Sequence, residues 1–150
     1  MTQGQSLRTG PVLLVEDSPD DLDAVRRAFR KVGFAGIPDH VCTGEDAMKY
    51  LRSSDRIRPS VILLDLNMRG MGGHKTLEML KQDKDLKDIP VVVLTTSDYD
   101  ADIKICYSLG ANTYIQKPVD FDLLCRAIRN IKEYWFDTAV LPRPASDLGV

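Results

Sequence analysis

The chain has 150 residues and a formal net charge of -2, from 20 Lys and Arg against 22 Asp and Glu residues. This near balance, with no block rich in Lys or Arg, argues against nucleic-acid binding as the main role. The cysteines Cys42, Cys106 and Cys125 have no CxxC spacing and are interpreted as buried thiols in a reducing cytosol. Neither a secretion signal nor an apolar run long enough for a bilayer is evident, so a cytoplasmic location is expected.

Short β-rich runs alternate along the chain with longer helical patterns. The first helix is well delimited, because Ser18 suits its N-cap, Pro19 its first helical position and Gly33 its end. In chain order, strands are predicted at residues 11–16, 38–42, 60–65, 89–96 and 112–116. The helices that follow them are predicted at residues 18–33, 44–54, 72–83, 97–110 and 120–136.

This repeated strand–helix order predicts a parallel α/β sheet with helices on both faces. Continuous apolar runs such as residues 61–64 are typical of strands that are buried on both sides. We therefore expect one domain over residues 10–136, preceded by a disordered N-terminal tail at 1–9. Residues 137–150 are predicted to form a C-terminal extension, because prolines interrupt any helical pattern there.

Charged and hydroxyl side chains stand where the predicted strands end. Glu16 and Asp17 close the first strand, Asp65 closes the third, Thr95 lies at the end of the fourth, and Lys117 follows the fifth. The carboxyl ends of parallel strands share one edge of the sheet, and open α/β sheets bind their ligands at that edge. We therefore expect these side chains to lie close together in one cleft.

Such a group of carboxylates indicates a cation site. Two carboxylates about 5 Å apart repel by roughly 3 kcal/mol at an effective dielectric of about 20, so the group must take up protons or a cation. Oxygen ligands suit Mg²⁺. Asp17 is a stronger candidate than Glu16 for direct ligation, and the main-chain carbonyl of Asn67 could reach the metal. Asp65, beside Mg²⁺ and Lys117, is then suited to attack phosphorus and form an aspartyl-phosphate.

Four sequence motifs occur together in a familiar order. They are "LLVEDSPDD" with its acidic pair, "VILLDLNM" with Asp65, "VVVLTTS" with Thr95 and "YIQKPVD" with Lys117. In this order and at these intervals, over about residues 10–132, the chain resembles the receiver domain of two-component response regulators. The resemblance implies a flavodoxin-like fold, a doubly wound (βα)5 parallel sheet with strand order 2-1-3-4-5.

The resemblance also implies a set of roles for the site residues. Asp65 would accept a phosphoryl group from the phosphohistidine of a sensor histidine kinase, in a Mg²⁺-dependent self-phosphorylation followed by slow autodephosphorylation. Thr95 and Lys117 would bond to the phosphoryl oxygens, and Tyr114 would be the switch aromatic that turns inward with Thr95. The metal ligands implied by the family are Glu16, Asp17, Asp65 and the main-chain carbonyl of Asn67. The Lys117–Pro118 bond is expected to be cis.

One position departs from the family pattern. Arg69 stands where a proline commonly follows the acceptor by four residues, and the next residues, 70–73, include three glycines. We expect this loop to be more mobile, with different access of water or a phosphodonor to Asp65.

Three aromatic residues end the last predicted helix. Because Tyr134, Trp135 and Phe136 are consecutive, they cannot all face one core, and at least one should be exposed at an interface. With the tail that follows, this end resembles the small single-domain response regulators paired with bacterial phytochromes. That resemblance implies a bacteriophytochrome as the kinase. It also implies a homodimer through helix 97–110, strand 112–116, helix 120–136 and the extension.

Other interpretations remain open at this point. Taken alone, Asp65 could cap a turn, Lys117 could be a surface charge, Tyr114 could be core packing, and the aromatic triplet could be covered by the chain's own tail. His40 and His74 are interpreted as structural or surface residues. Alternative functions are a phosphotransfer carrier within a phosphorelay, a phosphorylation-independent binding module, or a phosphatase. The last lacks a second acid, because Asn67 stands two residues after Asp65.

Overall fold

The computed structural model describes residues 10–142 of the chain. The predicted tail at 1–9 lies outside the described residues, and so does most of the predicted extension, from residue 143 onward.

A parallel sheet forms the centre of the molecule. Its strands lie in the order β2-β1-β3-β4-β5, as predicted, and every neighbouring pair is parallel. The strands are β1 (Val12–Val15), β2 (Asp39–Val41), β3 (Val61–Leu64), β4 (Val91–Thr95) and β5 (Thr113–Gln116). The fold is thus the doubly wound, flavodoxin-like (βα)5 architecture that the resemblance to receiver domains implied, and its parallel sheet is the one that the alternation of elements predicted.

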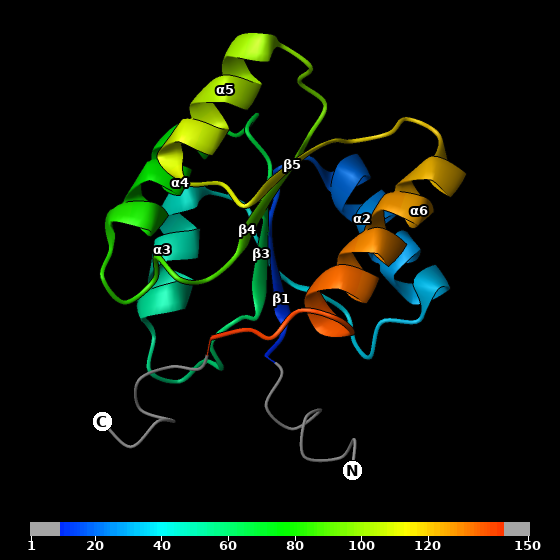
Figure 1. The fold of residues 1–150 in the computed structure, drawn as a ribbon, viewed down its shortest axis with the longest axis horizontal. Coiled ribbons are helices and arrows are strands. Elements are labelled where there is room, and N and C mark those ends of the chain that lie inside the picture. Colours follow the sequence, from blue (N-terminus) through cyan, green and yellow to red (C-terminus); the bar gives the residue numbers. More distant parts are fainter. Residues whose placement is uncertain (1–9, 143–150) are drawn as a thin grey trace.

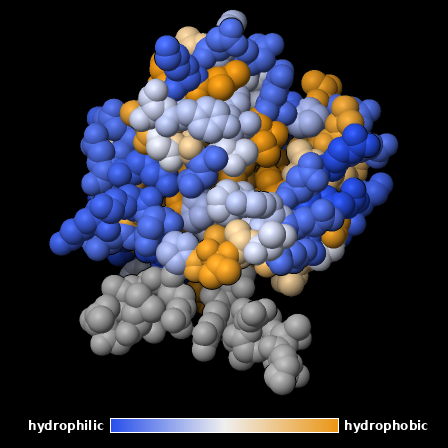
Figure 2. All heavy atoms as spheres, in the orientation of Figure 1, coloured by the Kyte–Doolittle hydropathy of each residue, from blue (hydrophilic) through white to orange (hydrophobic). Residues whose placement is uncertain are grey.

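Helices cover both faces of this sheet. They are α2 (Pro19–Val32), α3 (Gly44–Arg52), α4 (Gly73–Gln82), α5 (Asp100–Leu109) and α6 (Phe121–Ile131), which continues into the π-helical turn η1 (Lys132–Phe136). Helices α2 and α6 pack on one face, and α3, α4 and α5 pack on the other (Figure 1). In the orientation of Figure 2, hydrophilic side chains cover the two helical flanks and apolar atoms show between them.

The strands supply both hydrophobic cores because alternate side chains point to opposite faces. In β1, Leu13 and Val15 pack toward α3, α4 and α5, whereas Val12 and Leu14 pack toward α2 and α6. All four residues of β3 are fully buried, which agrees with the unbroken apolar run in the sequence. No helix among residues 10–142 has both the length and the apolar character needed to cross a bilayer.

Helix α2 has the ends that the sequence predicts. The Ser18 hydroxyl accepts a hydrogen bond from the Asp21 main-chain N–H at 3.3 Å, and Pro19 is the first helical residue. The helix ends at Gly33, whose φ of 82° places it in the left-handed region that glycine adopts without strain. The Ser18 cap fixes the first turn of α2 directly beside the end of β1.

Two helices differ from their predicted bounds by three residues or more at one end. Helix α5 begins at Asp100, three residues later than predicted. Ser97 lies in the loop before the helix, and its hydroxyl donates to the carboxylate of Asp102 in the first turn at 2.5 Å. The last α-helix ends at Ile131, and the wider π turn after it is closed by the Asp137 N–H, which donates to the Lys132 carbonyl at 3.1 Å.

Candidate functional site

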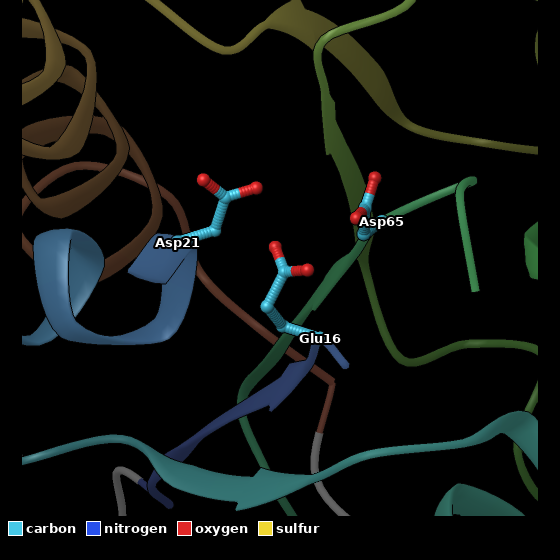
Figure 3. A group of neighbouring side chains, drawn as sticks. All are labelled: Glu16, Asp21 and Asp65. Atoms are coloured by element: carbon cyan, nitrogen blue, oxygen red, sulfur yellow. The ribbon is translucent and has the colours of Figure 1, made fainter. Parts of the chain in front are cut away.

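Three carboxylates converge at the carboxyl edge of the sheet. Glu16 follows β1, Asp65 follows β3, and Asp21 lies in the first turn of α2, with one oxygen of each within 4.8 Å of the others. Figure 3 shows the three side chains pointing toward a common space. Glu16 and Asp65 are buried, at 1% and 5% exposure, so their charges require compensation within the protein.

Lys117 supplies that compensation. Its Nζ lies 2.6 Å from Glu16 Oε1, 3.0 Å from Asp21 Oδ2 and 4.0 Å from Asp65 Oδ2. The Lys117 main-chain N–H donates to the Thr95 carbonyl at 2.6 Å, which ties the start of the loop after β5 to the end of β4. One ammonium thus faces three carboxylates, and the cluster keeps an excess of negative charge.

Burial and mutual contact change the pKa values of Glu16 and Lys117. Burial raises the pKa of Glu16 to about 7, and the Asp65 carboxylate adds to the rise, while the hydrogen bond from Lys117 opposes it. Burial alone lowers the pKa of Lys117, but the hydrogen bond to Glu16, the charges of Asp65 and Glu16 and the hydrogen bond to Asp21 outweigh it and raise the pKa. Lys117 is therefore held as a cation.

The bond between Lys117 and Pro118 is trans, since no peptide bond within residues 10–142 is cis. The predicted cis bond is therefore wrong. The trans form, which X–Pro bonds favour by about 0.5–1 kcal/mol, already brings the Lys117 ammonium to Glu16 and Asp21.

Asp17 has a different partner from Glu16. Its Oδ2 accepts hydrogen bonds from the Arg69 main-chain N–H at 3.0 Å and from Arg69 Nε at 3.4 Å. The third carboxylate that lies within 4.8 Å of Glu16 and Asp65 is that of Asp21, whereas the sequence suggested Asp17. Direct metal ligation by Asp17 stays a prediction. Asp21 was missed because "SPDD" is also a favourable helix start, where acidic residues are common.

Asn67 connects the acceptor loop to the end of β4. Its main-chain N–H donates to Asp65 Oδ1 at 3.3 Å, and its Nδ2 donates to the hydroxyls of Thr95 and Thr96, both at 3.4 Å. Thr95 is fully buried, as expected for a residue at the end of a central strand. The predicted hydroxyl therefore lies beside the loop that carries Asp65.

Tyr114 links β5 to the loop after β4. Its hydroxyl donates to the Ser97 carbonyl at 2.8 Å, and its main-chain N–H donates to the Tyr107 hydroxyl at 3.1 Å. The ring is half-buried and packs against the core under α3, α4 and α5. Burial raises the pKa of the Tyr114 hydroxyl, which therefore stays protonated as a donor.

His40 also contacts the site, through the main chain. Its Nε2 on β2 lies 2.6 Å from the Glu16 carbonyl oxygen, which accepts from the ring N–H. This contact holds the end of β1, where Glu16 turns its side chain toward Lys117, and agrees with the structural role expected for His40.

The chain matches the response regulator receiver domain family over residues 12–129. It is 40% identical over 137 residues to the probable methanogenesis regulatory protein FilR2 of Methanothrix harundinacea, covering 89% of this chain and 88% of that protein. It is 36% identical over 139 residues to the response regulator Rcp1 of Synechocystis sp., covering 87% and 92% of the two chains.

Solved structures show the same relationship. The phosphorylated cyanobacterial phytochrome response regulator RcpA superimposes with a TM-score of 0.80 at 36% identity, covering 89% of this chain and 99% of that chain. The Mn²⁺-bound form of Rcp1 superimposes with a TM-score of 0.77 at 34% identity, covering the same shares. The predicted resemblance to phytochrome response regulators is confirmed by these similarities.

The acidic cluster fits the divalent-metal pocket of such proteins. Its donors are hard carboxylate oxygens from Glu16, Asp21 and Asp65, gathered at one edge and only partly neutralised by Lys117. Ligands of this type suit Mg²⁺ and Mn²⁺. The sheet order, the acidic pocket and the match across nearly the whole domain agree, and the chain belongs to the response regulator receiver domain family.

Proposed function

We propose that this protein is a single-domain response regulator. It accepts a phosphoryl group on Asp65 from a histidine kinase and signals through protein–protein contacts. The observation that carries the proposal is the position of the Asp65 carboxylate, which is buried at the end of β3 with Lys117 Nζ 4.0 Å from its Oδ2. An acceptor carboxylate next to a fixed ammonium is suited to phosphoryl transfer.

In the proposed step an Asp65 carboxylate oxygen attacks the phosphorus of the kinase phosphohistidine. The new P–O bond forms as the P–N bond breaks, and the departing imidazole takes up a proton. Lys117 and the Thr95 hydroxyl then contact phosphoryl oxygens. Mg²⁺, when bound, supplies neutralisation of the charge on those oxygens, and its proposed ligands are Glu16, Asp17, Asp65 and the Asn67 main-chain carbonyl.

Incubation with a small phosphodonor and Mg²⁺ tests the acceptor. We expect one hydroxylamine-labile acyl phosphate per chain, with slow loss on removal of the donor, and none in Asp65→Asn. Asp98→Asn, a change at an exposed carboxylate in the loop after β4, is the matched control and should behave as wild type. A chain that takes up no phosphoryl group is a binding module, and turnover of many equivalents identifies a phosphatase. Either result rejects the proposal.

The readout of phosphorylation is proposed to pass through Thr95 and Tyr114. Phosphorylation adds roughly -1.5 to -2 charge at Asp65, which draws the Thr95 hydroxyl and reorganises the loop after β4. Because the Tyr114 hydroxyl is bonded to the Ser97 carbonyl of this loop, the movement reaches β5 and α5. The switch is a two-state equilibrium biased by the phosphoryl group.

The proposed kinase is a bacteriophytochrome, supported by similarity to Rcp1 and RcpA. Purified phytochrome kinase loaded with labelled phosphate should transfer it to wild type and not to Asp65→Asn. A kinase of another sensory class that transfers label when phytochrome kinases do not would reject this partner. Onward transfer of label to a histidine phosphotransfer protein would instead favour the phosphorelay carrier.

We further propose a homodimer through the face formed by α5, β5 and α6 together with the C-terminal extension. Exposed apolar side chains support this face, with Ile105 and Tyr107 on α5, Leu123 on α6 and Tyr134 on η1. Cys106 and Cys125 are buried as predicted, whereas Cys42 is exposed, contrary to the prediction. The three free thiols support a reducing compartment, and we place the protein in the cytoplasm. Sedimentation of the phosphorylated and unphosphorylated chain measures the association directly.

A further inference from the structure

Lys117 has a carboxylate partner that the acceptor chemistry does not require. Asp21 Oδ2 lies 3.0 Å from Lys117 Nζ, within hydrogen-bond distance, whereas Asp65 Oδ2 lies at 4.0 Å. Glu16 is the other hydrogen-bonded partner, at 2.6 Å. In this structure the ammonium is therefore directed to Glu16 and Asp21, and it makes no hydrogen bond to the acceptor.

The start of α2 determines where Asp21 points. The Ser18 hydroxyl accepts from the Asp21 main-chain N–H, which fixes this residue in the first turn above the end of β1. The Asp21 side chain is 38% exposed, while the ammonium it contacts is only 6% exposed. The preceding residue, Asp20, is exposed on the same turn and forms no ion pair with Lys117.

A phosphoryl group on Asp65 places new negative charge next to both residues. The third N–H donor of Lys117 must then reach the phosphoryl oxygens, which requires Nζ to move toward Asp65, and the hydrogen bond to Asp21 opposes that movement. The Asp21 carboxylate also repels the added charge, because like charges within a few ångströms disfavour each other. Both effects oppose the phosphorylated state, and both depend on the charge of Asp21.

We propose that Asp21 is a positioning residue that holds the Lys117 ammonium away from Asp65 and so restrains formation of the phosphorylated state. This inference rests on the proposed function, since it assumes that Asp65 is the acceptor. It assigns Asp21, which the carboxylate cluster also offers as a metal donor, a role through Lys117 in setting how readily the switch turns on.

Beryllium fluoride, a non-covalent mimic of the phosphoryl group, tests the inference at equilibrium. Its affinity is measured from amide NMR spectra with Mg²⁺ at saturation for each variant. Asp21→Asn should bind it about fivefold more tightly than wild type, the size expected for loss of a half-buried charge pair. Asp20→Asn removes the same charge from the same turn and should stay within about twofold of wild type. Asp21→Glu keeps a carboxylate and should remain close to wild type.

The outcomes distinguish a failure of the proposed acceptor function from a failure of the proposed role of Asp21. If wild type does not bind beryllium fluoride, the proposed acceptor function is rejected. If wild type binds but Asp21→Asn matches Asp20→Asn, the role of Asp21 is rejected. If Asp21→Asn binds both Mn²⁺ and beryllium fluoride more weakly than wild type, Asp21 is a metal ligand, and its role as a positioning residue is rejected.

A second measurement reports on Lys117 directly. The ¹⁵N signal of its side-chain ammonium, assigned by its loss in Lys117→Arg, should shift in Asp21→Asn and Asp21→Ser and stay in place in Asp20→Asn. An unchanged signal in both Asp21 variants overturns the proposal, whichever of them folds better.

Discussion

Arg69 holds the Asp17 carboxylate through two donors, its main-chain N–H at 3.0 Å and its Nε at 3.4 Å. The Asp17 side chain is 14% exposed, and that of Arg69 is 89% exposed at the mouth of the acidic cluster. The residue that departs from the family pattern is therefore in contact with the carboxylate proposed as the direct metal ligand. A divalent cation that binds Asp17 must compete with the guanidinium.

Replacement of Arg69 by Ala should strengthen metal binding. The main-chain contact remains, but loss of an exposed ion pair should raise Mn²⁺ affinity about two- to fivefold at low salt. The gain should shrink as ionic strength rises, because salt screens exposed charges. Titration by electron paramagnetic resonance measures the affinity. Lys75→Ala, which removes a positive charge from an exposed pair on α4, should have a smaller effect. Equal affinities for Arg69→Ala and wild type would refute the competition.

Replacement of Lys117 by Met should destabilise the metal-free fold. The change leaves Glu16, Asp21 and Asp65 without their ammonium, and removal of one partner from a buried pair costs about 3 kcal/mol. Mg²⁺ should recover more stability in the variant than in wild type, because the cation replaces the lost charge. Urea unfolding with and without Mg²⁺ measures both effects, with the exposed Lys104→Met as control. A variant as stable as wild type without metal contradicts the assignment.

The aromatic triplet should divide into a core part and a surface part. Phe136 packs edge-on against Phe34, with ring centroids 5.3 Å apart, whereas Tyr134 is 56% exposed. Phe136→Ala should therefore lower the free energy of unfolding by about 2 kcal/mol, and Tyr134→Ala should change it by less than about 0.5 kcal/mol. In sedimentation, Tyr134→Ala should weaken self-association. If it associates as wild type does, Tyr134 is not part of the dimer contact.

The Cys106 thiol should make stability fall at alkaline pH. Burial, with the Asp102 charge adding to it, raises the pKa of Cys106 from 9.0 to about 11. Because the pKa of Cys106 is higher in the folded than in the unfolded state, the neutral thiol contributes to the free energy of unfolding. That contribution is complete below pH 9 and is lost as pH rises through 11. Between about pH 8 and pH 10, wild type should lose about 1 kcal/mol more than Cys106→Ala. Parallel losses in urea unfolding would exclude this effect.

Local sequence signals predicted the fold because they coincide with its elements. Ser18, Pro19 and Gly33 lie at the ends of α2 where capping chemistry places them, and the apolar run of β3 is buried on both faces. Glu16 and Lys117 were predicted to meet because parallel strands share an edge, and they do. Each of these inferences needs only short-range pattern and the rule for parallel sheets.

The details that were missed depend on contacts between distant residues. Asp21 is a plausible helix-start acid in sequence, and its partner Lys117 lies 96 positions away. The contact of Arg69 with Asp17 spans 52 positions. The π turn after Ile131 carries Trp135 and Phe136, which both pack against the core under α2 and α6, whereas Tyr134 is exposed. Sequence pattern alone contains none of these pairings.

The Glu16–Lys117 pair joins positions that are 101 residues apart, and β5, which precedes the lysine, is an edge strand of the sheet. The ribosome makes the acidic half of the pocket long before it makes the ammonium that completes it. Until residue 117 has been added, the chain holds Glu16, Asp21 and Asp65 without the ammonium that they face in the folded domain. Chains that end before residue 117 are therefore expected to lack the cation of the acidic cluster.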